Sequence, residues 1–159
     1  MLNKNKNPGQ RGKYAEGKVR EVLHALSGEF AGFDWERIYD ARSAGGKFPS
    51  RPGDFAFYAH RLHGLIEVKE VEHDFRLPSK NMKKEQIAKL YKRDLAGGLI
   101  LVLVCHKTTM LWRSVPLSWL QQRAAQPSWD LSVHGTLASA EEALTPLRAL
   151  LKMKLEGAS

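Results

Sequence analysis

A continuous apolar run from Leu99 to Cys105 constrains the fold of this chain most strongly. The run has the length of a strand, and an unbroken apolar stretch is typical of a central strand covered on both faces. Around it, segments with helical spacing of apolar residues alternate with short runs rich in aromatic and branched residues. The sequence therefore predicts an α/β fold, and its 159 residues are enough for one substantial core.

The expected elements follow from apolar spacing and from the positions of glycine and proline. Residues 1–11 are polar and basic, and we interpret them as a flexible arm before a single domain over 12–159. Strands are predicted at 33–42, 54–59, 63–70, 99–105 and 108–115. The predicted helices are at 12–27, from an N-cap at Ser79 to Leu95, and at a short segment with Pro116 in its first position. A C-terminal helix is predicted over about 140–151, and Pro146 is expected to kink it or delay its start.

The composition points to a polyanionic partner. Lysine and arginine outnumber the acidic residues by 25 to 17, and the formal net charge is +8, which favours nucleic acid although many basic proteins bind none. The single Cys105 excludes an internal disulfide and is interpreted as a small buried hydrophobic residue. No apolar stretch approaches the length of a membrane span, and the N-terminus has no hydrophobic signal core. We therefore expect a soluble, cytoplasmic protein without membrane association.

Two carboxylates and a lysine are expected to meet on the predicted hairpin. If its strands pair antiparallel around residues 60–61, Asp54 lies opposite Glu67, with Cβ atoms about 5 Å apart. Lys69 then shares a face with Glu67, about 7 Å further along the strand. Two carboxylates beside one ammonium need a cation, a shared proton or solvent, and a divalent metal is the functional solution. The turn lacks an Asn-Gly pair, so another register stays open.

Each of these fragments also has an ordinary structural interpretation. A Glu-x-Lys segment on a strand is usually a solvated face with a weak ion pair, and an Asp after Pro-Gly is usually a turn residue. His60, His63 and His73 lack zinc-ligand spacing, and we interpret them as exposed or phosphate-contacting residues. Trp112, Trp119 and Trp129 are interpreted as core or interface anchors. A basic run covers the second predicted helix, and it either faces solvent or contacts a phosphate backbone. Its residues are Lys80, Lys83, Lys84, Lys89, Lys92 and Arg93.

At these residues the chain resembles a known family. The pattern Asp54…Glu67-Val68-Lys69 resembles the PD-(D/E)XK nuclease superfamily, and its surroundings resemble Holliday-junction resolvases. Similarity to the archaeal Hjc-like enzymes lies in 12–16 (GKYAE) and 42–45 (RSAG), and similarity to the bacterial RecU-like enzymes lies in 67–69, 77–78, 80–81 and 85–87. The similar region spans about 11–120, with Gly53 between Pro52 and Asp54 as a departure. The resemblance implies a restriction-endonuclease-like core, in which helices flank a central mixed β-sheet.

The resemblance also implies roles for individual residues. Asp54 and Glu67 would bind Mg²⁺ or Mn²⁺ together with the backbone carbonyl of Val68, and Glu16 would reach the same site from the first helix. Lys69 would position the attacking water and stabilise the charge that develops on the phosphate. Ser43 would contact the scissile strand, and Gln86 would orient the site or the phosphate. Three other glutamates compete for the carboxylate roles, and we interpret them as surface residues: Glu21, Glu70 and Glu72.

The function predicted from these observations is that of a Mg²⁺-dependent endodeoxyribonuclease that resolves four-way (Holliday) DNA junctions by paired phosphodiester cleavage, in recombination and repair. Two alternatives stay open: a restriction or repair nuclease of the same superfamily, and a non-catalytic structure-selective DNA-binding protein. Paired cuts need two sites and the chain supplies one, so we expect a homodimer. Candidate apolar surfaces for its interface are residues 112–120 and the C-terminal helix.

Overall fold

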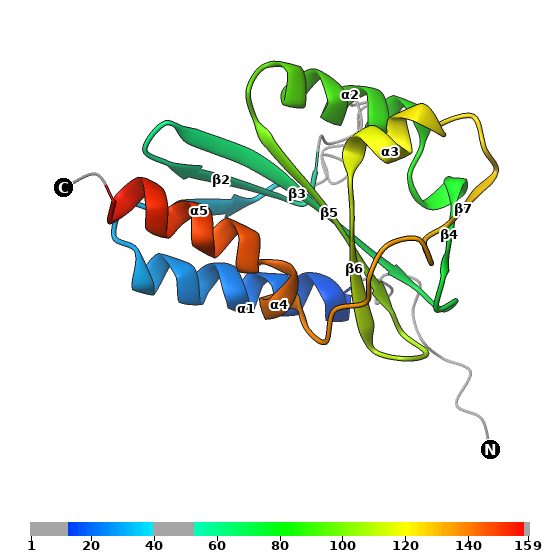
Figure 1. The fold of residues 1–159 in the computed structure, drawn as a ribbon, viewed down its shortest axis with the longest axis horizontal. Helices are drawn as coiled ribbons and strands as arrows, with labels where there is room; N and C mark the ends of the chain where they lie inside the picture. Colours follow the sequence, from blue (N-terminus) through cyan, green and yellow to red (C-terminus); the bar gives the residue numbers. More distant parts are fainter. Residues whose placement is uncertain (1–12, 40–52, 158–159) are drawn as a thin grey trace.

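The computed structural model describes residues 13–39 and 53–157, so the predicted basic arm and Ser43 lie outside the described residues. Within these ranges, helices lie on both faces of a five-stranded sheet, and a two-stranded sheet lies beside it (Figure 1). No described helix combines the length and apolarity needed to cross a membrane. The elements are α1 (Lys13–Glu29), β1 (Asp34–Arg37), β2 (Phe55–Ala59), β3 (Leu62–Val71), β4 (Arg76–Pro78), the 3-10 helix η3 (Ser79–Asn81), α2 (Lys84–Leu95), β5 (Leu99–His106), β6 (Leu111–Val115), α3 (Leu117–Gln122), β7 (Ser128–Asp130), α4 (Ala140–Ala143) and α5 (Thr145–Leu155).

The main sheet has the strand order β1-β2-β3-β5-β6. Strands β3 and β5 are parallel, whereas the other neighbouring pairs in this sheet are antiparallel. Strand β5 contains the apolar run of residues 99–105, and its side chains enter the cores on both faces of the sheet. The predicted α/β class, with a central mixed sheet flanked by helices, is confirmed.

The structure has the strand register predicted for the β2–β3 hairpin. Phe55 pairs with Ile66 at the open end of the hairpin. At the other end Ala59 pairs with Leu62, so residues 60–61 form the turn. The second turn residue is an arginine with φ of 52°, in the left-handed region that few non-glycine residues adopt. The buried faces of the two strands therefore set this register, because a slip of one residue would turn every apolar side chain outward.

Two apolar cores hold the main sheet, one on each face. Helices α1, α4 and α5 lie on one side and α2 and α3 on the other (Figure 1). Ile66 and Val68 of β3 belong to the core under α1, whereas Leu65 and Val71 belong to the core under α2. Since successive strand residues point to opposite faces, Glu67 falls on the α2 side of the sheet.

The helix predicted from Ser79 to Leu95 is interrupted. Ser79 begins the 3-10 helix η3, and Met82 follows it in an extended conformation with its side chain fully buried. Helix α2 begins only after Lys83, which occupies the N-cap position. Met82 anchors this extended step in the core beneath α2, so the prediction of one continuous helix is wrong.

Other boundaries also differ from the predictions. Strand β1 ends at Arg37, well before residue 42, and β6 begins later than predicted because residues 107–110 turn. Pro116 is the N-cap of α3 and not its first residue. Pro146 delays the last helix, as expected, because the chain leaves α4 at Leu144 before α5 begins.

The segment 112–120 was predicted as an apolar surface for a dimer, but most of its apolar side chains are buried in the core of the chain. Its apolar side chains other than Trp119 are at most 6% exposed, so this part of the interface prediction is wrong. The C-terminal helix α5 does present an apolar side chain to solvent, since Met153 is 63% exposed. Cys105 and Trp129 are fully buried, as predicted.

Candidate active site

Asp54 is fixed at the start of β2 by backbone hydrogen bonds on both sides. Its N–H donates to the Ile66 carbonyl of β3 over 2.9 Å, and its own carbonyl accepts from the Ile38 N–H over 2.9 Å. Its carboxylate oxygen Oδ2 accepts the Val68 N–H over 2.7 Å. Only 1% of Asp54 is exposed, so its carboxylate is held in place by the strand that carries the Glu-x-Lys segment.

Glu67 is equally buried, and Asp54 is close enough to perturb its ionisation. Burial raises the pKa of Glu67 above its usual value, and the negative charge of Asp54 raises it further. Lys69 and Gln86 lower this pKa, but burial and Asp54 outweigh them. The structure thus brings the two predicted carboxylates close enough to repel each other.

Lys69 and Gln86 complete a polar group that we call the Glu67 cluster, made of Asp54, Glu67, Lys69 and Gln86. The ammonium of Lys69 lies 2.5 Å from Oε1 of Glu67, and its side chain is 18% exposed. Gln86 comes from the first turn of α2 and lies close enough to Glu67 to lower the pKa of that carboxyl. The hairpin therefore supplies three members of the cluster, and the helix packed over it supplies the fourth.

Glu16 forms an ion pair with a residue outside this cluster. It lies in the first turn of α1, and its carboxylate forms an ion pair with Arg37 of β1. Arg37 is the register partner of Phe55, whose ring is in the core under α1. The Glu16–Arg37 pair thus belongs to the α1 side of the sheet, while the Glu67 cluster faces α2. A shared role of Glu16 with Asp54 and Glu67 stays a prediction.

The donor set of the Glu67 cluster suits a hard divalent cation. Oxygen Oε2 of Glu67 is buried and has no hydrogen-bond partner among the described residues. Over residues 13–39 and 53–157, no group of three or more His, Cys, Asp or Glu side chains is arranged to hold a metal ion. A cation here would rest on the carboxylates of Asp54 and Glu67. This suits Mg²⁺, which commonly keeps several waters and binds through one or two carboxylates.

Glu70 has a structural use that the sequence interpretation missed. Its side chain was expected at the surface but is only 3% exposed. Oxygen Oε1 lies 3.2 Å from the Lys107 ammonium, and Oε2 accepts the Ala15 N–H at 3.4 Å. Glu70 thereby ties the end of β3 to the start of α1. The parallel pairing of β3 with β5 brings residues 70 and 107 together, and local spacing carries no signal for such a distant pairing.

The other charged and histidine residues of interest lie at the surface. Glu21 and Glu72 are exposed, in agreement with their interpretation as surface carboxylates. The exposed residues also include His60, His63, His73, Lys80, Lys83, Lys84, Lys92 and Arg93, whereas Lys89 is half-buried.

The mixed sheet with helices on both faces matches the expected fold of the restriction-endonuclease-like type. A solved structure with this fold is that of Hjc from Archaeoglobus fulgidus, described as a Holliday junction resolvase from an archaeal hyperthermophile. The two chains are 21% identical and align with a TM-score of 0.51, over 77% of this chain and 95% of that chain. The resemblance to Hjc-like resolvases is thereby confirmed at the level of the fold. No protein-family model and no curated protein matches the sequence.

Proposed function

We propose that this protein is a metal-dependent DNA endonuclease that resolves four-way junctions by paired phosphodiester cleavage. The observation that carries the proposal is the Glu67 cluster, in which two buried carboxylates share a site with a partly exposed lysine. The fold shared with A. fulgidus Hjc and the net charge of +8 support a DNA substrate.

The energetics of the cluster favour a bound cation. Burying like charges side by side is costly, and a single lysine offsets only part of that cost. Asp54 and Glu67 would hold Mg²⁺ or Mn²⁺, with the Val68 carbonyl as a further oxygen ligand and Glu16 as a more distant one. When bound, such a cation lowers the pKa of its water and polarises the scissile phosphate.

Lys69 has two tasks in this proposal. Its ion pair with Glu67 holds the carboxylate in place, and its partial exposure leaves the ammonium accessible to a phosphate. A fixed ammonium beside the reacting phosphate stabilises the negative charge that develops there and orients the attacking water. Gln86 lies beside Glu67 and is proposed to keep it oriented, and Ser43 is proposed to contact the scissile strand.

The proposed active form is a homodimer. A four-way junction is cut on two strands related by approximate two-fold symmetry, and each chain supplies one Glu67 cluster. A dimer with both clusters on one basic face would match that substrate. An enzyme of this kind would act inside the cell, where its DNA substrate is found.

One assay separates the proposed function from its alternatives. Labelled four-way junction and linear duplex of the same sequence are incubated with the protein in Mg²⁺ or in chelator. Asp54→Asn serves as the matched variant. We expect Mg²⁺-dependent nicking of the junction by the wild type and none by Asp54→Asn. Preferential cutting of the duplex would identify a restriction or repair nuclease. Junction binding without any metal-dependent nicking would identify a non-catalytic DNA-binding protein.

Paired cleavage is tested with mixed dimers on a supercoiled cruciform plasmid. Dimers with one wild-type chain and one Asp54→Asn chain should nick the cruciform once, whereas wild-type dimers should linearise it in one binding event. Linear product from the mixed dimers, or a strictly monomeric active protein, would contradict the paired-site mechanism.

A further inference from the structure

A pocket of about 570 Å³ lies at the end of β3, between that strand, the short strand β4 and η3. Val71 of β3 lies in its wall, two residues beyond Lys69 and on the same face of the strand. Arg76, Lys80 and Lys107 bring positive charges to this pocket, and Glu70 and Glu72 bring negative ones. Its size is within the range of pockets that bind small ligands or single nucleotides.

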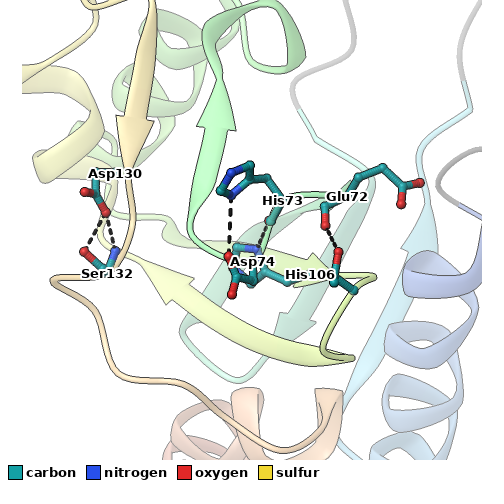
Figure 2. Close-up of polar contacts among 7 residues, drawn as sticks. Glu72, His73, Asp74, His106, Asp130 and Ser132 are labelled. Carbon is teal, nitrogen blue, oxygen red and sulfur yellow. Dashed lines mark hydrogen bonds and ion pairs between the residues drawn. The ribbon is translucent and has the colours of Figure 1, made fainter.

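The rim of this pocket is held by contacts from the β5–β6 connection. The ring nitrogen Nδ1 of His106 lies 2.7 Å from the His73 carbonyl, and the Thr108 hydroxyl donates to the Glu72 carbonyl. Figure 2 shows the backbone carbonyls of Glu72 and His73 accepting these contacts, with the Glu72 carboxylate directed away from His73. These contacts hold the rim against the end of β5.

The three basic side chains of the pocket outnumber its two acidic ones, Glu70 and Glu72. Glu70 is neutralised by Lys107, which lies 3.2 Å away. Arg76 donates to the Ser128 hydroxyl at 2.9 Å, and no described acid lies within ion-pair distance of Arg76 or Lys80. Two cations are thus exposed at the pocket without an ion-pair partner in the described part of the chain.

Asp130, the register partner of Arg76, lies near this arginine without forming an ion pair with it. Its oxygen Oδ1 accepts the Ser132 N–H at 2.9 Å and the Ser132 hydroxyl at 2.6 Å, as Figure 2 shows. These bonds lower the pKa of Asp130 most, and the charge of Arg76 lowers it further. The guanidinium of Arg76 has N–H groups besides the one bonded to Ser128, and these can donate to an external anion.

We propose that Arg76 and Lys80 bind a backbone phosphate of the DNA near the cleaved bond. Strand β3 links the pocket to the cluster, because Val71 in the pocket wall lies about 7 Å beyond Lys69. This inference rests on the proposed function and assigns a second contact point for its substrate.

The first test measures junction affinity as a function of salt concentration in chelator, so that no cleavage is needed. The variant is Arg76→Gln/Lys80→Gln, and the charge-matched control is Arg20→Gln/Lys152→Gln, whose exposed side chains lie on α1 and α5. Each lost phosphate contact should flatten the slope of log K against log salt by about 0.9. We expect a flatter slope for the pocket variant than for the control. Equal slopes in the two variants would overturn the proposal.

The second test locates the phosphate. Cleavage positions are mapped with the wild type, and junctions are then made with one neutral methylphosphonate linkage at successive positions near the cut. At one position near the cut, the neutral linkage should weaken binding by the wild type but should have no further effect on binding by the pocket variant. Such non-additivity identifies interacting groups. Additive effects at every position would contradict a contact there.

Failure of this inference is distinguishable from failure of the proposed function. If the wild type binds and nicks the junction but the pocket variant behaves like the control, the phosphate contact is wrong and the nuclease stands. If the wild type never nicks the junction but the difference in salt slope is found, the phosphate contact is supported and the proposed nuclease function is wrong. Thermal unfolding of both variants is measured beforehand, to confirm that each folds as the wild type does.

Discussion

Two glutamates on the same strand, Glu67 and Glu70, are used by the fold in opposite ways. Both side chains are nearly buried, and each lies beside a lysine, Lys69 for Glu67 and Lys107 for Glu70. Glu70 engages both of its oxygens inside the protein, one with Lys107 and the other with the N–H of Ala15. Glu67 instead lies near a second carboxylate and keeps a buried oxygen without a partner among the described residues.

The difference separates a structural ion pair from a candidate catalytic one. An ion pair whose carboxylate oxygens all have partners stabilises the contact between two elements. Glu70 does this between β3 and α1. Like charges in a buried site cost stability, and such strain is expected where a ligand relieves it. Burial and an adjacent lysine are common to both residues, so neither property alone marks a functional site.

The largest expected effect comes from neutralising the Glu67 cluster. Asp54→Asn and Glu67→Gln should each lower junction nicking by at least about 10²-fold, a loss typical of removing an electrostatic element of an active site. Binding of the junction in Ca²⁺ should persist, because the DNA contacts are spread over the basic surface. Nicking rates in Mg²⁺ are the measurement. Near-normal nicking by both variants would contradict the catalytic role of Glu67 and so its difference from Glu70.

The next effect concerns stability. Glu70→Gln breaks a nearly buried ion pair and should lower the free energy of unfolding by about 1–3 kcal/mol, since hydrogen bonds to charged groups contribute on this scale. Chemical denaturation is the measurement. Nicking at a temperature well below the transition should stay within a few-fold of wild type. If Glu70→Gln abolished nicking and left stability unchanged, the two glutamates would have exchanged roles.

A smaller effect is expected from the helix that covers the cluster. Gln86→Ala removes an amide that lies near Glu67 and lowers its pKa, and a loss of about 1.4 kcal/mol in positioning corresponds to a tenfold slower nicking rate. The exposed neighbour Glu85 provides the matched control, because Glu85→Ala lies on the same turn of α2. Equal rates for the two variants would show that Gln86 does not orient the site.

The smallest expected effect is a pH dependence of stability in the absence of metal. The folded state raises the pKa of Glu67 above its usual value of 4.5, so this group stabilises the fold only while protonated. Its contribution is present below about pH 4.5 and is lost as the pH rises through the folded pKa. The difference in unfolding free energy between Glu67→Gln and wild type should therefore grow in favour of the variant as the pH rises. A difference that stays constant with pH would contradict the raised pKa.

Much of this arrangement could be predicted from the sequence, because it depends on local periodicity. Alternation along β3 places Glu67 and Lys69 on one face, and the apolar faces of the hairpin strands set the register that brings Asp54 near Glu67. The unbroken apolar run of β5 identified the central strand. In each of these cases, the pattern within one or two neighbouring segments carries the information.

The features that could not be predicted depend on contacts between distant segments. The role of Glu70 follows from the parallel pairing of β3 with β5 and from the approach of α1, neither of which leaves a local signal. The break at Met82 arises because this side chain is needed in the core, although the surrounding spacing continues to look helical. The pairing of Glu16 with Arg37 likewise depends on where α1 crosses the sheet.

The most direct test of the central claim is Mn²⁺ binding by the free protein, followed through the electron paramagnetic resonance signal of unbound Mn²⁺. Wild type, Glu67→Gln and Glu70→Gln are titrated under the same conditions and in the absence of DNA. The account predicts that Glu70→Gln binds Mn²⁺ as the wild type does, and that Glu67→Gln binds at least about tenfold more weakly, because it lacks one of two carboxylate ligands. Wild-type affinity in Glu67→Gln, or an equal loss in both variants, would contradict it.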